Sequence, residues 1–455
     1  MEVGFETVGN AILICHDREP ILVTDPWLIG GAYFGSWNYS HQIPEEQMQS
    51  IKKAKYLWIS HGHPDHLSSK SLQLLQGKPI LLPNHVGGRI YNALKEQGYD
   101  VRILQDRVWY PLSDRIRVLS ISDYIQDGIL LVDINGRLVV DFNDATDKGW
   151  GHFVRKTIEK YDISFMLRLA GYGDADMINI TYDDGTILRP IIKKDAVGTY
   201  ISRASKVYGV KYYVPFSSMH VYQRSDSVWA NQYRTELPDY ENGFHSDSTT
   251  LLPAFVRYDC LKDTYEKINP PPVVEKVHDP KEFGDDWDEP LEESDVQMIN
   301  QYFKSFEHLR NHFDFINFRV AKKDHMVELA KNRFHRGITF EAPRHSLMTA
   351  VEYQIFDDML IGNFMKTTLH GKFTHSGLHP DFTPYVGKFG DNGLARTEEE
   401  LEKYFKEYRK RSPVEYILHR IEERSLETVR SLVPRGSDTF ETLKRVYYWF
   451  KTSLA

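Results

Sequence analysis

Short apolar runs bounded by turn-forming residues recur through the first 260 residues of the chain. Each run holds five to seven residues, is rich in Val, Ile, Leu and Tyr, and is flanked by Gly, Asp, Asn or Pro. The eight clearest runs cover residues 12–16, 21–26, 56–61, 79–83, 116–122, 128–134, 137–142 and 211–216. Runs of this length and composition are typical of buried β-strands. Because helical stretches lie between many of them, this region is predicted to fold as a layered α/β domain.

The pattern changes after about residue 260. Residues 261–295 are dense in Pro and acidic side chains and show no hydrophobic period, which is typical of a linker or a surface strap. Strand-like and helical stretches then resume, including a capped helix predicted over 397–412. We therefore expect a first domain over 1–260, the strap, and a C-terminal α+β domain over 296–455. Residues 432–437 spell a thrombin cleavage sequence, which is either an expression remnant or a coincidence.

Composition and charge narrow the class of protein. Of the 455 residues, 41% are hydrophobic and 13% aromatic, which is far from the composition of a disordered chain. The net charge of -8 argues against nucleic acid as the main partner. With Cys15 and Cys260 as its only cysteines, the chain lacks the residues for a disulfide framework, a Cys-rich zinc site or a four-thiolate iron–sulfur cluster. A reducing, cytoplasmic setting is expected, and the lack of an 18-residue apolar stretch predicts no integral membrane association.

The segment most informative about chemistry reads His61-Gly-His63-Pro-Asp65-His66 and follows an apolar run. With 19 His in the chain, three at fixed offsets would arise by chance only about 0.03 times, before an Asp is also required. His61 and His63 leave an extended segment on the same side, whereas Asp65 and His66 are expected where a helix begins and face another direction. Four donors in this arrangement can serve two adjacent metal ions. Exposed turn histidines are the alternative explanation.

This segment resembles the His-x-His-x-Asp-His signature of the metallo-β-lactamase superfamily, and the resemblance covers roughly residues 1–260. It implies an αββα sandwich, in which two stacked sheets carry helices on both outer faces. The run ending in Asp25 is similar to an early strand of the family, which implies that Asp25 orients the metal loop. The run through Asp141 is similar to the strand whose Asp bridges the two metals. The resemblance assigns that bridge to Asp144, with Asp141 as the alternative.

Two further ligands are implied by the same resemblance. No counterpart of the family's third His lies some twenty residues before Asp144, but Asp123 lies 21 positions upstream, and we expect its carboxylate to stand in. The family's last His is assigned to His220, because it leaves a strand end late in the domain; an ordinary loop His is the alternative. The implied first site is His61, His63, Asp123 and Asp144, and the second is Asp65, His66, Asp144 and His220. Two divalent ions per chain are expected, and the oxygen-rich donor set makes iron or manganese competitive with zinc.

A polar and aromatic loop at 222–231 is a candidate substrate contact. Arg224 is predicted to pair with a substrate carboxylate or phosphate, and Trp229 to cover an apolar or sugar surface. The alternative is a loop held by its own hydrogen bonds.

Hydrolysis is the predicted reaction, because two metals can hold a bridging hydroxide that attacks a carbonyl or phosphorus centre. Asp65 is the candidate catalytic residue, since it would orient that hydroxide as well as bind metal. The short motifs resemble most the branch of ascorbate-6-phosphate lactonase and N-acyl-phosphatidylethanolamine phospholipase D. The predicted substrate is therefore a small molecule with an ester, lactone or phosphodiester bond.

A di-iron oxygenase is the alternative. Residues 355–362 and 378–381 weakly resemble the same-fold part of CMP-N-acetylneuraminate hydroxylase, and some members of the fold replace the third His by a carboxylate. The two cysteines cannot make the cluster of that enzyme's Rieske domain, so an oxygenase would need a separate reductase. A non-catalytic metal-binding relative is the second alternative, and a homo-oligomer stays open.

Overall fold

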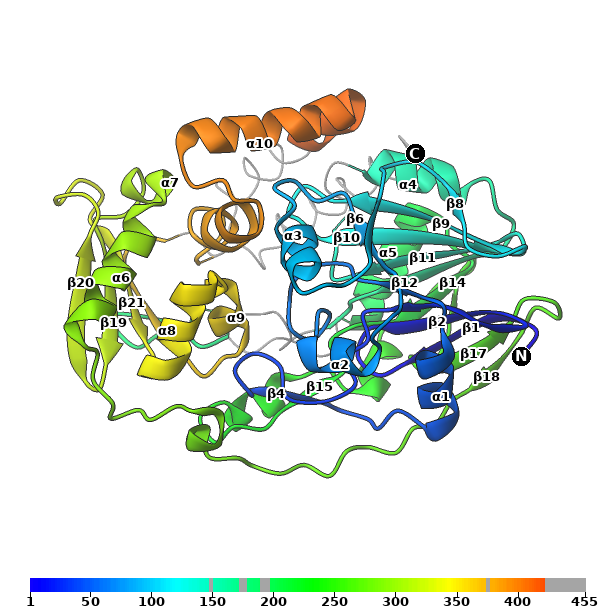
Figure 1. The fold of residues 1–455 in the computed structure, drawn as a ribbon, viewed down its shortest axis with the longest axis horizontal. Helices are drawn as coiled ribbons and strands as arrows, with labels where there is room; N and C mark the ends of the chain where they lie inside the picture. Colours follow the sequence, from blue (N-terminus) through cyan, green and yellow to red (C-terminus); the bar gives the residue numbers. More distant parts are fainter. Residues whose placement is uncertain (147–149, 172–177, 189–196, 374–376, 422–455) are drawn as a thin grey trace.

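The computed structural model describes residues 1–146, 150–171, 178–188, 197–373 and 377–421. Residues 432–437, the thrombin-like sequence, lie outside this part of the chain. Two large sheets, a smaller third sheet and the helices around them make up the molecule (Figure 1).

The first sheet has eight strands in the order β18-β17-β1-β2-β3-β5-β6-β7. Its strands are β1 (Val3–Val8), β2 (Ile12–Asp17), β3 (Glu19–Thr24), β5 (Tyr56–Trp58), β6 (Ile80–Pro83), β7 (Val101–Leu104), β17 (Val256–Asp259) and β18 (Thr264–Lys267). The second sheet has seven strands in the order β16-β14-β12-β11-β10-β9-β8. Its strands are β8 (Tyr110–Pro111), β9 (Ile116–Ser122), β10 (Gly128–Ile134), β11 (Arg137–Asn143), β12 (Ser164–Arg168), β14 (Tyr212–Pro215) and β16 (Thr250–Leu251). All eight apolar runs of the sequence are therefore strands, as predicted.

The two sheets pack face to face, and helices cover both outer faces (Figure 1). Phe5 of β1, Val139 of β11 and Phe165 of β12 share one buried core between the sheets. The first sheet's outer face packs on three helices, and the second sheet's on two. These helices are α1 (Glu45–Lys53), α2 (Ser69–Leu74) and α3 (Arg89–Glu96) on one side, and α4 (Gly151–Ile158) and α5 (Val197–Tyr208) on the other. This order of layers confirms the predicted αββα sandwich.

The tight connection between β10 and β11 shows how local sequence sets the register. Asn135 and Gly136 are its two central residues, and both have positive φ, 50° and 80°. Asn-Gly is the pair that such two-residue hairpin turns prefer, because both positions need a left-handed backbone. The turn fixes the pairing of β10 with β11 and so the place where β11 ends, beside the candidate metal ligands.

A third sheet, in the order β13-β22-β21-β19-β20, forms the core of the C-terminal α+β domain. Its strands are β13 (Ile180–Tyr182), β19 (Phe315–Val320), β20 (Lys323–Glu328), β21 (Arg336–Glu341) and β22 (Lys366–Gly371). Helices α6 (Glu293–Lys304), α7 (Glu307–Arg310), α8 (Arg344–Tyr353) and α9 (Phe356–Ile361) accompany it. Pairing crosses the predicted boundaries at two points: β13 comes from inside 1–260, and β18 follows residue 260. Both are short edge strands, and β18 is exposed throughout, so neither has an apolar run that a sequence pattern could show.

Residues 261–295, the predicted linker or strap, contain a long extended stretch. Figure 1 shows it as a long extended trace along one edge of the molecule. Val273 donates its backbone N–H to Ser40 at 2.9 Å, and the backbone N–H of His278 donates to Gln223 at 2.7 Å. Backbone hydrogen bonds thus hold this Pro-rich stretch against the small β4–β15 ribbon, formed by Trp37–Tyr39 and His220–Tyr222.

Helix α10 (Glu398–Arg411) packs across the top of both domains in Figure 1. It begins after Thr397, whose hydroxyl accepts from the Glu400 backbone N–H at 3.2 Å, so the predicted cap is confirmed. Tyr404 of α10 donates to the Tyr124 carbonyl of the first domain at 3.1 Å. Within the described part of the chain, no helix combines the length and apolar character needed to cross a bilayer.

Glu6 of β1 provides a stability prediction. It is 2% exposed, accepts from Gln47 at 2.8 Å and Arg257 at 2.7 Å, and pairs with His16 at 2.9 Å. Burial alone would raise its carboxyl pKa, but these partners lower it from 4.5 to about 2. A lowered acid pKa adds stability that is present above the ordinary pKa and is lost as the pH falls towards 2. We expect Glu6→Gln to lower the free energy of unfolding by about 3 kcal/mol at pH 7.

The measurement is urea unfolding of wild type and Glu6→Gln at pH 7, 4 and 3. The difference between the two proteins should shrink as the pH falls. Glu46 is an exposed carboxylate that pairs with the same Arg257, and Glu46→Gln is the control. We expect this change to lower the free energy of unfolding by less than about 1 kcal/mol. A Glu6→Gln penalty that is equal at pH 7 and pH 3 would contradict the assignment.

Candidate metal centre

The loop after β5 carries four of the predicted ligands, and local hydrogen bonds shape it. The backbone N–H groups of His66 and Leu67 both donate to the His63 carbonyl, at 3.0 and 2.7 Å. Helix α2 begins only at Ser69, so Asp65 and His66 lie in this turn and not at a helix start as expected. The turn still separates the two pairs of donors, as the sequence predicted, because it changes the direction of the chain between His63 and His66.

The first group of donors consists of His61, His63 and Asp144. One ligand atom from each lies within 4.8 Å of the other two. The Nε2 atom of His61 and the Nδ1 atom of His63 are 2.8 Å apart, and the Ser60 hydroxyl lies 2.8 Å from the other nitrogen of His61. Both imidazoles are buried. Two neutral imidazole nitrogens facing one point beside a carboxylate are a suitable set for a divalent transition metal.

The second group consists of Asp65, His66 and Asp144. The Nε2 atom of His66 lies 3.4 Å from an Asp65 oxygen and 3.3 Å from an Asp144 oxygen. Asp144 thus belongs to both groups, which is the position that a bridging carboxylate needs. Asp141, the alternative bridge, belongs to neither group; it is fully buried within β11, and burial holds its pKa well above the ordinary value. The geometry therefore favours Asp144 as the bridge, and its role as a ligand stays a prediction.

Asp25 organises the loop from the end of β3. It accepts from the Ser60 backbone N–H at 2.8 Å and from the Ser60 hydroxyl at 2.7 Å. It also lies 3.0 Å from Nδ1 of His66 and accepts from Asn143 at 3.1 Å. A carboxylate on the far nitrogen of a ligating His fixes the tautomer and the ring orientation, so Asp25 leaves Nε2 of His66 directed at the second group. The supporting role predicted for Asp25 agrees with these contacts.

Asp65 is also held in place. Asn10 donates to one of its oxygens at 2.9 Å and Tyr33 to the other at 2.6 Å. Burial opposes its charge, but His66, the charge of His63 and the Tyr33 hydroxyl lower its pKa strongly. Asp65 is therefore an oriented carboxylate anion, as a ligand must be.

His220 lies on β15, with its ring stacked on Trp37 at a centroid distance of 3.4 Å. Its Nδ1 is 3.2 Å from the Ser218 carbonyl, whereas its Nε2 is buried and has no hydrogen-bond partner. Burial lowers the pKa of this His to about 3, and the charges of Asp65 and Asp144 act on it in the opposite direction. His220 is in neither three-residue group, but an unpartnered nitrogen near these carboxylates fits the predicted fourth ligand of the second site.

Asp123 is not brought into either group of donors. One of its oxygens accepts from the backbone N–H groups of Ile125 and Asp127, at 2.8 and 3.0 Å. The other accepts from the backbone N–H and the hydroxyl of Thr146, at 3.2 and 3.1 Å. These contacts give the carboxylate a role in shaping the 123–127 turn. They do not support the prediction that it replaces the family's third His.

The side chains of the two predicted substrate contacts, Arg224 and Trp229, are both engaged within the protein. Arg224 is fully buried, pairs with Asp226 at 2.8 Å and Asp285 at 2.7 Å, and donates to the Phe34 carbonyl at 2.9 Å. Its guanidinium is thus engaged within the protein, and the loop is held by its own bonds. Trp229 donates its indole N–H to the Asp226 carbonyl at 3.1 Å, in an aromatic cluster. Neither set of contacts supports direct substrate binding.

Three residues of the C-terminal domain reach the site, and sequence reasoning missed them. Asp357 of α9 lies 3.1 Å from Nε2 of His63. Lys388, on the π-helical segment Pro384–Asn392, lies 3.2 Å from Asp127 and 3.9 Å from Asp357. Burial raises the pKa of Asp358 to about 7, and the charge of Asp357 adds to the rise. The C-terminal domain therefore supplies two carboxylates and a cation beside the metal loop.

The residues present fit two metal ions. The Nε2 atom of His220 is buried and unpaired, which costs about 1–3 kcal/mol, whereas Nε2 of His66 makes no hydrogen bond but faces Asp65 and Asp144 at 3.4 and 3.3 Å. A bound ion would satisfy both nitrogens. His61, His63 and Asp144 would hold the first ion, and Asp65, His66, Asp144 and His220 the second.

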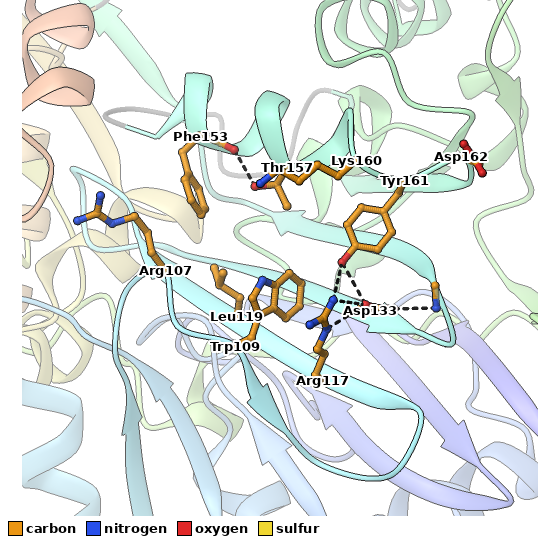
Figure 2. Close-up of a pocket in the computed structure, with 11 residues that line it drawn as sticks. Arg107, Trp109, Arg117, Leu119, Asp133, Phe153, Thr157, Lys160, Tyr161 and Asp162 are labelled. Carbon is orange, nitrogen blue, oxygen red and sulfur yellow. Dashed lines mark hydrogen bonds and ion pairs between the residues drawn. The ribbon is translucent and has the colours of Figure 1, made fainter.

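A pocket of about 640 Å³ lies on another part of the first domain, between α4 and the second sheet (Figure 2). Figure 2 shows Arg117 beneath Tyr161, with both side chains bonded to Asp133. Arg117 also lies over the Trp109 ring at 4.8 Å. None of the residues of the two metal groups lines this pocket, so it is separate from the candidate centre.

No protein-family model matches the chain. Curated relatives are cytidine monophosphate-N-acetylneuraminic acid hydroxylases. The protein from Asterias rubens is 30% identical over 140 residues, which cover 29% of this chain and 21% of the relative. The protein from Danio rerio is 27% identical over 154 residues, which cover 32% of this chain and 26% of the relative. The inactive human protein is 22% identical over 341 residues, which cover 70% of this chain and 66% of the relative. The chain thus spans from about a fifth to two thirds of the length of these relatives.

Two solved structures illustrate the structural comparison. The di-iron β-hydroxylase CmlA from Streptomyces venezuelae has 16% identity and a TM-score of 0.28, covering 56% of this chain and 45% of its own. The isothiocyanate hydrolase from Delia radicum gut bacteria has 14% identity and a TM-score of 0.35, and the match covers 56% of this chain and 98% of the hydrolase. The fold is established by the layers and the metal loop of the molecule itself. Helices flank two stacked sheets, and the His-x-His-x-Asp-His loop after β5 meets Asp144 after β11, so this chain has the metallo-β-lactamase fold.

Proposed function

We propose that the chain is a non-haem di-iron oxygenase that hydroxylates a small molecule with electrons from a separate reductase. The observation that carries this proposal is the donor set of the first group, His61, His63 and Asp144. Two imidazoles and one carboxylate are a donor set of non-haem iron(II) oxygenases, and the same set also holds zinc in some hydrolases, so it is compatible with both metals. The curated relatives are hydroxylases by name, which supports the same reaction class. This ordering reverses the sequence-based preference for a hydrolase.

Two iron ions, when bound, would supply the reduction of oxygen. The overall reaction consumes one oxygen molecule, two electrons and two protons, converts a C–H bond to C–OH and releases water. Both electrons must come from outside the chain, because Cys15 and Cys260 are buried free thiols that cannot hold an iron–sulfur cluster. Asp358, with a pKa of about 7, can hold a proton beside the site near neutral pH.

The substrate class follows the relatives' names. Those proteins are named for a nucleotide-linked sugar acid, so we extend the proposal to a small or nucleotide-linked substrate.

Metal-dependent hydrolysis is the second candidate. Asp144 is shared by both groups of donors, and Asn10 and Tyr33 hold Asp65 beside them. This arrangement also suits two redox-inert ions and a hydroxide that Asp65 orients. An ester, lactone or phosphodiester would then be the substrate.

Metal exchange separates the two candidates. We expect iron-loaded protein to absorb in the visible and to consume oxygen when a chemical reductant is added, and zinc-loaded protein to do neither. Asp144→Asn should abolish the oxygen consumption because both positions lose an anionic donor. Anaerobic turnover of an activated ester, lactone or phosphodiester by the zinc or manganese form, with no oxygen uptake by the iron form, would overturn the oxygenase proposal in favour of the hydrolase.

A further inference from the structure

A second cluster of metal-ligand side chains lies in the C-terminal domain and shares no residue with the metal centre. It consists of His308 on α7, His312 in the turn that follows, and Asp381 in the loop after β22. One ligand atom of each residue lies within 4.8 Å of the other two.

Local structure brings the two imidazoles together. The turn continues past α7, because the backbone N–H of Asn311 donates to His308 at 3.0 Å and that of Phe313 donates to Leu309 at 2.9 Å. Residues four apart on a helical turn share one face, so His308 and His312 lie side by side, with ring centroids 4.0 Å apart. Leu309 and Phe313 are fully buried in the domain core and anchor the turn from its other face.

Three of the four imidazole nitrogens have no hydrogen-bond partner among the residues that the structure describes. Nε2 of His308 and both ring nitrogens of His312 are buried and make no hydrogen bond. Each unpaired buried polar atom costs about 1–3 kcal/mol, and three in one place are unusual for a native structure. The stacking of His308 on Tyr385, at a centroid distance of 3.2 Å, fixes its ring but gives its Nε2 no hydrogen-bond partner. An ion that accepts a lone pair from one nitrogen of each ring would remove this cost at two of the three atoms.

Asp381, the third member of the cluster, is held in place by Arg336. Arg336 donates from Nη1 to Oδ2 of Asp381 at 2.9 Å, and its guanidinium lies over the rings of Phe313 at 4.8 Å and Phe373 at 4.3 Å. The arginine is thereby fixed, and it holds one carboxylate oxygen while the other can bind a cation. A hydrogen bond of this kind behind a ligating carboxylate is common in metal sites.

We propose that His308, His312 and Asp381 form a separate site for one divalent transition-metal ion, preferably zinc, which joins the α7 turn to the loop after β22. Two imidazole nitrogens and one carboxylate oxygen occupy three positions of a tetrahedron, and water completes it. The ion has a structural role, because it links two segments that lie apart in the sequence, residues 308–312 and the loop around Asp381.

Metal content tests the site in the full chain. The Asp144→Ala variant serves as the background, since it removes the shared ligand of the metal centre. After chelation and dialysis against zinc, we expect Asp144→Ala to retain about one ion per chain and Asp144→Ala with His312→Ala to retain none. Cobalt should give visible absorption in the first protein and not in the second. His325→Ala is the matched control, because Nε2 of His325 on β20 is also buried and unpartnered but belongs to none of the metal groups; it should retain the ion.

Thermal unfolding provides a second measurement. Zinc should raise the melting temperature of Asp144→Ala by several degrees, because an ion that binds only the native state stabilises it, and the increase should disappear with His312→Ala. Asp381→Asn, which keeps the shape of the side chain, replaces His312→Ala if the latter fails to fold. Equal zinc content and equal melting shifts with and without His312 or Asp381 would overturn the proposal. An iron centre that proves inactive would leave it untouched, since the two sites share no residue.

Discussion

Replacing Asp144 by Ala is expected to remove both ions of the metal centre, whereas replacing His61 and His63 together should remove only one. The difference follows from geometry, because Asp144 contributes to both groups of donors and the two histidines to one. Loss of a supporting residue already costs about 10–100-fold in metal affinity or activity, so loss of a shared ligand should cost at least about 100-fold. Oxygen consumption by the iron-loaded protein should fall in parallel with the metal content.

The matched control for this experiment is Asp141→Asn. Asp141 lies three residues before Asp144, within β11, and was the alternative bridge, but it belongs to neither group. Metal analysis of protein prepared with excess iron, before and after gel filtration, gives the number of ions that each variant retains. Retention of two ions by Asp144→Ala, together with their loss from Asp141→Asn, would exchange the two assignments.

Local patterns predicted the sandwich well and the edges of the domains poorly. A strand such as β10, Gly128–Ile134, is buried over its whole length and apolar except for Asp133, and the Asn135-Gly136 turn after it sets the register with β11. Edge strands lack this signal. The three residues of β13 join the C-terminal sheet only because β22 lies beside them, and no property of residues 180–182 alone indicates that partner.

The candidate site shows the same division. The His61–His66 segment and Asp144 are close because each follows a strand end, and both positions can be read from the chain. Spacing predicted Asp123 less well, because the number of residues between two carboxylates does not show which way a side chain points. Its oxygens are occupied by backbone donors of its own turn and by Thr146.

The segment 355–362 carries a family resemblance, but the sequence does not show that Asp357 lies beside the metal loop. This residue is separated from His63 by 294 positions, and an Asp-Asp pair at the start of a short helix is ordinary in any soluble protein. Asp357 comes close to His63 only because the second domain packs against the first. Arg89 of the first domain donates to the Gln354 carbonyl at 2.8 Å, and Ser36 donates to the Gly362 carbonyl at 2.6 Å. Contacts on both sides of α9 thus fix where Asp357 stands.

This position makes Asp357 a positioning residue for a ligand. A carboxylate 3.1 Å from Nε2 of His63 favours the tautomer with the proton on that nitrogen, which leaves Nδ1 free beside Nε2 of His61. Lys388 faces Asp357 at 3.9 Å and Asp127 at 3.2 Å, and its charge helps to keep the pKa of Asp357 below the ordinary value despite burial. The second domain would therefore set the chemistry of the first metal position.

Asp357→Ala is accordingly expected to weaken metal binding at the first position by about 10–100-fold while leaving the second position occupied. Asp357→Asn should lose less, because its amide oxygen can still accept from Nε2–H of His63 when the side chain is oriented correctly. Glu352→Gln, an exposed change on the neighbouring helix α8, should have no effect. Stepwise titration of metal-free protein with iron(II) or cobalt(II) measures the two affinities separately, and circular dichroism checks the fold. If Asp357→Ala and Asp357→Asn bind both ions as tightly as wild type, His63 is oriented by its own loop, and the C-terminal domain takes no part in setting the metal centre.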